Sequence, residues 1–236
     1  MDLLDKEKLI KRGVVDFAEW NYEPLLGWIQ HMRFQVIWSL LGGQRFERLL
    51  EVGYGSGVFM LELAKYCSEL HGLDVHQMSQ KGQSIFASDG IMAQLESGSI
   101  ENAIYSDNDF DCFVIVSVLE FVENLPDACR ELRHISKRGG RIMIDTPGRS
   151  VIVDLGFRHL TGEGADETFE DRSRNLIPEL LGRSKTAVQD RASEVFVNDR
   201  LRGKSKRSRG YSAPRTTGCL RLRSIAEFEK TAWDDR

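Results

Sequence analysis

The sequence lacks the features that mark secreted, membrane-spanning and disulfide-stabilised proteins. Its 236 residues include four cysteines, none of which forms a C-x-x-C pair. Cys67 and Cys112 lie within apolar runs, which favours buried and reduced thiols. The first residues are charged and contain no apolar signal core, and no apolar run approaches the roughly 20 residues of a membrane span. We therefore expect a cytoplasmic protein without a membrane span.

The chain also has no overall excess of positive charge. Its net charge is −4, and 41% of its residues are hydrophobic, as in an ordinary globular protein. Basic residues gather only at the end: residues 185–236 have 13 Lys and Arg against 7 Asp and Glu, whereas residues 1–184 have 19 against 29. We expect a poorly defined basic segment there, and no nucleic-acid partner. The basic run 202–209 is the only hint of one, and it is open to three interpretations: a solvated tail, an anionic-surface patch or a C-terminus that is not the ancestral one.

What the chain does have is a glycine-rich segment after a short apolar run. Leu49, Leu50 and Val52 are followed by glycines at alternate positions, Gly53 to Gly57, and then by residues with helical spacing. This pattern predicts a strand, a tight turn and a helix. Glycine suits such a turn because it tolerates positive φ and lets a ligand approach the main chain, where the free N–H groups of the helix start are exposed.

The spacing of these glycines helps to distinguish between the kinds of ligand that such a turn can bind. The dinucleotide fingerprint G-x-G-x-x-G would require glycine at position 58, which is Val58. An NAD-dependent oxidoreductase is therefore disfavoured, although it remains an alternative. A purely structural strand-to-helix turn is another.

A second short strand, residues 70–76, ends in an acidic residue. Asp74 lies about 20 residues beyond the glycine segment, the offset at which a parallel α/β unit delivers an acid to a ribose. Its carboxylate could accept hydrogen bonds from both ribose hydroxyls. The alternative is an acid that only ends a strand.

Further strand–helix units follow. Phe110–Val122 is the most hydrophobic run in the chain and predicts a buried parallel strand. A helix is expected over 125–138, stopped by Gly139 and Gly140, and a fifth strand over 141–147. Alternation of strands and helices in this order predicts a doubly wound α/β fold with a mostly parallel sheet.

Three segments carry a resemblance to a known family. The E-x-G-x-G-x-G pattern that starts at Glu51 resembles motif I of the class I S-adenosylmethionine-dependent methyltransferases, in particular the type 11 group. Gly98–Asp111 is similar to the family segment G-D-A-E-x-L-P-F-x-D-N-S-F-D, and Phe110–Val122 to F-D-x-V-x-x-x-x-V-L-E-H-V. The resemblance covers about residues 45–150. It implies a Rossmann-like methyltransferase fold, whose usual C-terminal β-hairpin we expect to be incomplete or irregular here.

The resemblance also implies S-adenosylmethionine as cofactor. The cofactor-binding residues that it implies are Glu51, Gly53, Tyr54, Gly55, Gly57, Asp74, Val75, Ser99, Ile100 and Ser117. Among them, Glu51 and the glycines would hold the methionine end and the ribose side. Asp74 would hold the ribose, and Ser99 and Ile100 the adenine, with Ser99 in place of the usual Asp.

Catalysis and metal binding depend on the end of the fourth strand. Glu120 lies just past it and is the candidate catalytic residue, as a base or as an orienting group; a helix-start acid is the alternative. Some relatives bind a divalent cation through E-x-x-E-H at this place. Here Ser117, Glu120 and Phe121 occupy those positions, so we expect no metal site.

We expect three parts in the chain: an N-terminal helical cap or lid (1–47), a cofactor-binding methyltransferase core (48–184) and the basic segment (185–236). The aromatic residues of the first part either belong to an amphipathic helix on the sheet or line an acceptor pocket; they are Trp20, Tyr22, Trp28 and Trp38. The predicted function is methyl transfer to a small molecule, at oxygen, nitrogen or carbon. A cofactor-binding protein that has lost catalysis is the main alternative.

Overall fold

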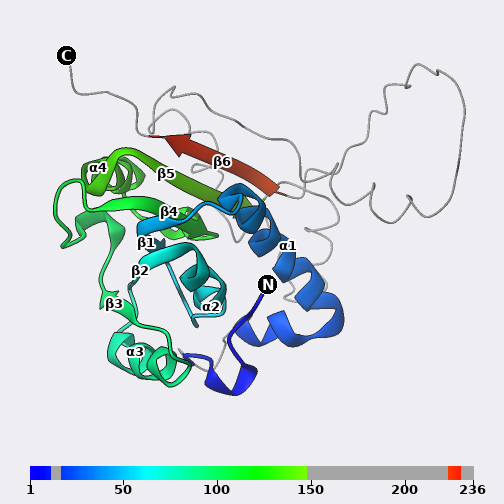
Figure 1. Cartoon of the computed structure of the whole chain (residues 1–236). Coiled ribbons are helices and arrows are strands. Elements are labelled where there is room, and N and C mark those ends of the chain that lie inside the picture. Colours follow the sequence, from blue (N-terminus) through cyan, green and yellow to red (C-terminus); the bar gives the residue numbers. More distant parts are fainter. Residues whose placement is uncertain (12–16, 148–222, 230–236) are drawn as a thin grey trace, which may run out of the picture.

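The computed structural model describes residues 1–11, 17–147 and 223–229, and within them six strands form one sheet (Figure 1). The strands are β1 (Phe46–Val52), β2 (Cys67–Asp74), β3 (Ala93–Ser97), β4 (Phe110–Val116), β5 (Ser136–Pro147) and β6 (Arg223–Glu229). Their order across the sheet is β3-β2-β1-β4-β5-β6. The first five are parallel, and β6 is antiparallel to β5. The predicted doubly wound, mostly parallel sheet is confirmed.

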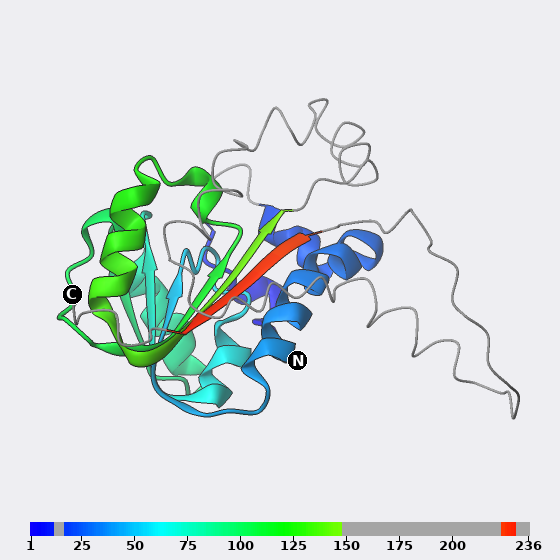
Figure 2. The same ribbon diagram turned by 90° about the horizontal axis from the view of Figure 1, so that it is seen from above.

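Helices cover both faces of this sheet. The α-helices are α1 (Pro24–Leu41), α2 (Met60–Leu63), α3 (Ser79–Ser88) and α4 (Leu125–Ile135). Short 3₁₀ helices are η1 (Lys6–Lys8), η2 (Phe17–Tyr22), η3 (Ala64–Tyr66), η4 (Ile100–Asn102) and η5 (Leu119–Phe121). Seen from above, α4 lies on one side of the strands, and α1 and α2 lie on the other (Figure 2).

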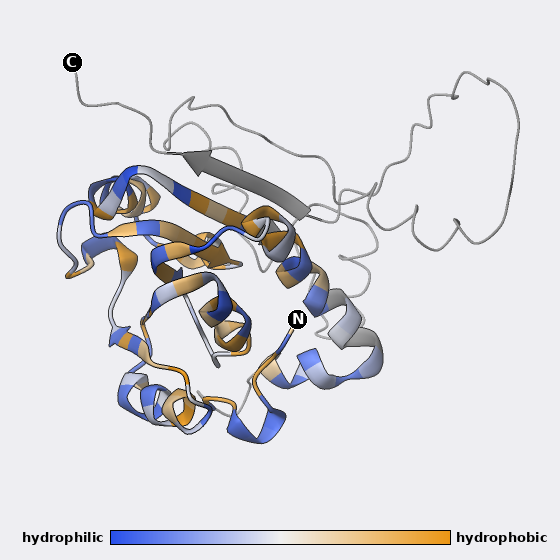
Figure 3. Cartoon of the chain, viewed as in Figure 1, coloured by the Kyte–Doolittle hydropathy of each residue, from blue (hydrophilic) through white to orange (hydrophobic). Residues whose placement is uncertain are grey.

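The core has one hydrophobic cluster on each face. Leu49, Cys112 and Met143 point toward α1, α2 and α3, whereas their chain neighbours Leu50 and Phe113 point toward α4. Because both faces are covered, the central strand β4 is a nearly continuous apolar run, and Figure 3 shows hydrophobic colour on parts of β4 and β5.

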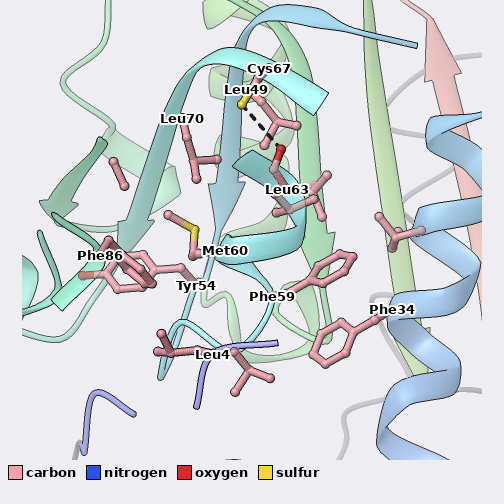
Figure 4. Close-up of a cluster of buried hydrophobic side chains, with 14 of the residues drawn as sticks. Leu4, Phe34, Leu49, Tyr54, Phe59, Met60, Leu63, Cys67, Leu70 and Phe86 are labelled. Atoms are coloured by element: carbon pink, nitrogen blue, oxygen red, sulfur yellow. Dashed lines mark hydrogen bonds between the residues drawn. The ribbon is translucent and has the colours of Figure 1, made fainter. Parts of the chain in front are cut away.

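Helix α1 is attached to the core by aromatic stacking. The ring of Phe34 stacks on that of Phe59, with centroids 4.5 Å apart, as Figure 4 shows. Pro24 begins the helix, and Gly42 ends it in the left-handed conformation (φ 59°), as the Gly42-Gly43 pair predicts.

The first ten residues differ from the sequence-based expectation. Their apolar residues predict a helical stripe from Leu3 onward, but of residues 1–11 only Lys6–Lys8 form a 3₁₀ turn. The segment 2–10, called the N-terminal strap below, instead donates backbone hydrogen bonds to the loop after β1: Leu4 N–H to the Val58 carbonyl (3.1 Å) and Ile10 N–H to the Ser56 carbonyl (3.2 Å). Leu4 and Ile10 are fully buried. The expected helix is wrong here because these apolar residues find their partners across the loop, a long-range contact that periodicity does not reveal.

The C-terminal strand β6 lies along the outer edge of β5, with Ile144 opposite Ala226 (Figure 1). The sequence of the C-terminal segment predicts final strands over 194–197 and 219–223, and β6 shares only Arg223 with the second of them. The rest of that strand, residues 194–197 and the basic run 202–209 lie outside the described residues. In the described part of the chain, no helix has the length and hydrophobicity that a membrane span needs.

Candidate functional site

The order of the strands places a topological switch point at the carboxyl ends of β1 and β4, where doubly wound sheets have their ligand crevice. The chain moves outward from β1 through β2 to β3, then crosses back to β4 on the other side of β1. In doubly wound sheets, ligands bind at such a switch point, outside the carboxyl ends of the strands. The loops after β1 and β4 border the crevice here.

The loop after β1 contains the glycine turn, residues 53–57. Gly53, Gly55 and Gly57 all have positive φ (73°, 57° and 77°). A Cβ on Gly53 would lie 2.2 Å from Cγ2 of Val118, and one on Gly57 would lie 2.5 Å from Cζ of Phe86. Two independent constraints therefore favour glycine at positions 53 and 57: the positive φ of the backbone and the closeness of a neighbouring side chain.

Asp74, at the end of β2, is bonded directly to this turn. Its Oδ2 accepts a hydrogen bond from Gly55 N–H (2.8 Å), while Gly53 N–H donates to the Leu73 carbonyl (2.7 Å). Asp74 is 7% exposed. The structure thus brings together the acid and the glycines that the sequence placed in one site. Ribose binding by Asp74 stays a prediction.

His76 completes the support of the turn and was not singled out from the sequence. Its Nε2 lies 2.9 Å from the Gly55 carbonyl, and its Nδ1 lies 3.2 Å from Met78 N–H. The ring also packs edge-on against Tyr54, with centroids 4.9 Å apart. Its position two residues after a strand-end acid is the only signal that the sequence offers.

Glu51 lies on the α1 side of β1, beneath the glycine turn. Its side chain is buried, and its Oε2 has no hydrogen-bond partner among the described residues. Burial raises the pKa of Glu51 well above its ordinary value, the negative charge of Asp74 raises it further, and the positive charge of Arg33 opposes both. A buried acceptor without a donor is costly, so this atom is suited to a ligand that brings a donor.

The loop after β4 contains Ser117, a non-glycine residue with positive φ (53°). Its N–H donates to the Asp145 carbonyl on β5 (2.8 Å), and the Asp145 side chain is fully buried. Asp145 follows Met143 at a spacing of two, so it faces the α1 side, as Glu51 does. No motif in the sequence singles out Asp145 as a site residue.

Glu120 lies in η5, and its side chain is outside the part of the chain that the structure describes; its catalytic role stays a prediction. Across residues 1–11, 17–147 and 223–229, no group of three or more His, Cys, Asp or Glu is arranged to hold a metal ion.

The residues expected at the adenine have different surroundings. Val75 is 71% exposed beside the crevice. Ser99 caps η4: its hydroxyl accepts from Glu101 N–H (3.4 Å) and also donates to Oε2 of Glu101 (2.6 Å). Ile100 is only 3% exposed and packs in the α4-side core with Leu73. Little of its side chain is therefore available to a ligand, and the adenine contacts of all three stay predictions.

The aromatic residues of the N-terminal part make internal contacts. The hydroxyl of Tyr22 donates to the Leu4 carbonyl of the strap, and the indole N–H of Trp38 donates to the hydroxyl of Tyr66. Trp28 is about half exposed on α1. A pocket lined by these residues and Trp20 stays a prediction.

Comparison with known proteins agrees with this architecture. A family model described as "Methyltransferase domain" matches residues 50–144. The chain is 26% identical over 177 residues (73% of its length) to the ubiquinone/menaquinone biosynthesis C-methyltransferase of Dinoroseobacter shibae, and 26% identical over 125 residues (52% of its length) to the ubiquinone biosynthesis O-methyltransferase of Alkalilimnicola ehrlichii. These matches span 66% and 50% of the two relatives, so less than two thirds of either protein has a counterpart here.

A solved structure extends the agreement to the fold. A protein of Methanococcus maripaludis assigned to the S-adenosylmethionine-dependent methyltransferases superimposes with a TM-score of 0.60 at 17% identity, and the match covers 96% of this chain and 100% of the other.

Proposed function

Because this chain belongs to the class I S-adenosylmethionine-dependent methyltransferases, we propose that it binds S-adenosylmethionine at the glycine turn and transfers the methyl group to a small-molecule acceptor. The observations that carry the proposal are the hydrogen bond from Gly55 N–H to Asp74 and the buried Oε2 of Glu51, an atom that has no hydrogen-bond partner among the described residues.

The described residues fit this cofactor chemically. In the glycine turn, Gly53 and Gly57 make room for the side chains of Val118 and Phe86, and Gly55 has no Cβ to keep a ligand from the backbone. The Oε2 of Glu51 suits the ammonium group of a methionine moiety, because a charge-assisted hydrogen bond would satisfy it. Asp74 uses one oxygen for Gly55 N–H, but a carboxylate offers about four acceptor positions, so capacity for ribose hydroxyls remains.

We assign the methionine end to Glu51 and the glycine turn, and the ribose to Asp74. The bound cofactor supplies a methyl group on a sulfonium centre whose leaving group is already good. The residues of the crevice then have to align an acceptor with that methyl group and exclude water. Alignment of this kind can contribute roughly 7–11 kcal/mol to lowering a barrier.

We propose an acceptor of the quinol or phenol class, with methylation at oxygen or carbon. The support is the similarity to the two relatives of ubiquinone and menaquinone biosynthesis, one a C-methyltransferase and the other an O-methyltransferase. Glu120 is the candidate base for such an acceptor, since a phenolic nucleophile must lose a proton.

The test measures S-adenosylhomocysteine release from purified protein supplied with S-adenosylmethionine and a panel of quinols, phenols and amines. We expect turnover with at least one quinol or phenol and a lower kcat for Glu120→Gln. Binding of S-adenosylmethionine without turnover on any member of the panel would contradict the proposed methyltransferase activity and support the alternative, a cofactor-binding protein that has lost catalysis.

A further inference from the structure

The glycine turn is supported from two sides. The N-terminal strap donates to the carbonyls of Ser56 and Val58, so the outer side of the loop is fixed by backbone hydrogen bonds. The opposite side is bonded to the end of β2, where Asp74 accepts from Gly55 N–H. Gly55 has one further polar group, its carbonyl, and the group that contacts it is the ring of His76.

The contacts of His76 fix the tautomer of its ring. The Gly55 carbonyl can only accept, so Nε2, at 2.9 Å, must be the donor. Met78 N–H can only donate, so Nδ1, at 3.2 Å, must be the acceptor. The neutral ring with its proton on Nε2 satisfies both contacts at once. The backbone N–H of His76 also donates to Oδ1 of Asp74 (3.3 Å). Asp74 and His76 together thus bond both polar groups of Gly55, its N–H and its carbonyl.

This arrangement matters because Gly55 is held at φ 57°, in the left-handed region, with its N–H turned toward Asp74. The N–H and the carbonyl of Gly55 belong to two successive peptide planes, so bonding both groups restrains rotation about both φ and ψ of Gly55. Tyr54 packs edge-on against the His76 ring, with centroids 4.9 Å apart, and keeps the ring in place.

We propose that His76 is a positioning residue of the cofactor site: its Nε2–H holds the Gly55 carbonyl, so that the glycine turn is already in its binding conformation before the ligand arrives. This inference rests on the proposed function. It adds a specific residue that neither the glycine pattern nor the strand-end acid reveals.

Two substitutions separate this role from simple support of α3. Met78 is the N-cap residue of α3, so the Nδ1 contact belongs to the helix and the Nε2 contact to the turn. His76→Gln places an amide donor near the position of Nε2 and loses the acceptor for Met78 N–H. His76→Asn places an amide oxygen near the position of Nδ1 and does not reach the Gly55 carbonyl.

The experiment is calorimetric titration of the wild type and both variants with S-adenosylmethionine and S-adenosylhomocysteine, with thermal unfolding measured in parallel. We expect His76→Gln to bind within about twofold of wild type and His76→Asn to raise Kd about fivefold to tenfold, the effect of one ordinary hydrogen bond. The opposite order, or equal affinity of both variants with wild type, would overturn the positioning role. If the wild type itself binds neither ligand, the result contradicts the proposed function and not the role of His76 alone.

A measurement on the unmodified protein covers the case in which a variant does not fold. ¹⁵N NMR spectra of histidine-labelled wild type should show the His76 ring protonated on Nε2 and unprotonated on Nδ1. A ring protonated on Nδ1 would contradict the proposal, because such a ring cannot donate to the Gly55 carbonyl.

Discussion

Replacing Gly57 by alanine tests whether the glycine turn is specified by its surroundings. At φ 77°, a residue with a Cβ costs about 1–2 kcal/mol more than glycine. The new Cβ would also lie 2.5 Å from Cζ of Phe86, a fully buried ring in the α1-side core. Forcing extra volume into a packed core costs about 1–3 kcal/mol. We therefore expect Gly57→Ala to lower the free energy of unfolding by about 2–5 kcal/mol.

The chain provides a matched control in Gly90, which has nearly the same φ (75°). A Cβ at that position would meet no atom of the described residues within 4 Å. Urea denaturation of both variants separates the two contributions. Gly90→Ala should lose only the backbone contribution, about 1–2 kcal/mol. The double variant Gly57→Ala/Phe86→Leu should lose less stability than the sum of the losses of the two single variants, because the ring atom that causes the clash is gone.

Two results would refute this reasoning. If Gly57→Ala costs no more than Gly90→Ala, the contact with Phe86 is not a constraint on the turn. If the losses of Gly57→Ala and Phe86→Leu simply add in the double variant, the two residues are not coupled.

Two further predictions concern the pH dependence of unfolding. Burial first, and then the charge of Arg48, lowers the pKa of His71 from its ordinary 6.5, so the folded protein binds a proton less readily than the unfolded chain and stability is lost as pH falls below 6.5. The variant His71→Phe should flatten that loss in thermal unfolding from pH 7.5 to 5, and an unchanged slope would contradict this contribution of His71. Glu51 contributes a pH dependence of the opposite sign. Because its pKa is raised on folding, the folded protein retains a proton that the unfolded chain releases above about pH 4.5, so stability falls as pH rises. Glu51→Gln should gain stability relative to wild type between pH 5 and 8, and a constant difference would refute the assignment.

The sequence predicted the parts of the site that are encoded locally. The glycines after β1 and the acid after β2 were recognised because each depends on a few consecutive residues and on a fixed offset between them. Their direct bond, from Gly55 N–H to Asp74, agrees with that expectation. The central strand β4 was equally clear, because burial on both faces leaves a continuous apolar run.

The parts that sequence analysis missed depend on long-range partners. Leu4 and Ile10 fit a helical stripe in the sequence, but their backbone bonds to the loop after β1 decide where they lie. His76 looks like an ordinary loop histidine until the carbonyl of Gly55, 21 residues earlier, is placed beside it. The Oε2 of Glu51 likewise stands out only when the described donors around it are known.

The most direct test of the central claim is calorimetric titration of S-adenosylmethionine into wild type and Asp74→Ala. We expect saturable one-to-one binding by wild type. We also expect at least about a tenfold rise in Kd for Asp74→Ala, since the variant loses the bond to Gly55 and the charge-assisted bonds expected for the ribose. Absence of binding by wild type would contradict the cofactor assignment, and equal affinity of the two proteins would remove Asp74 from the site.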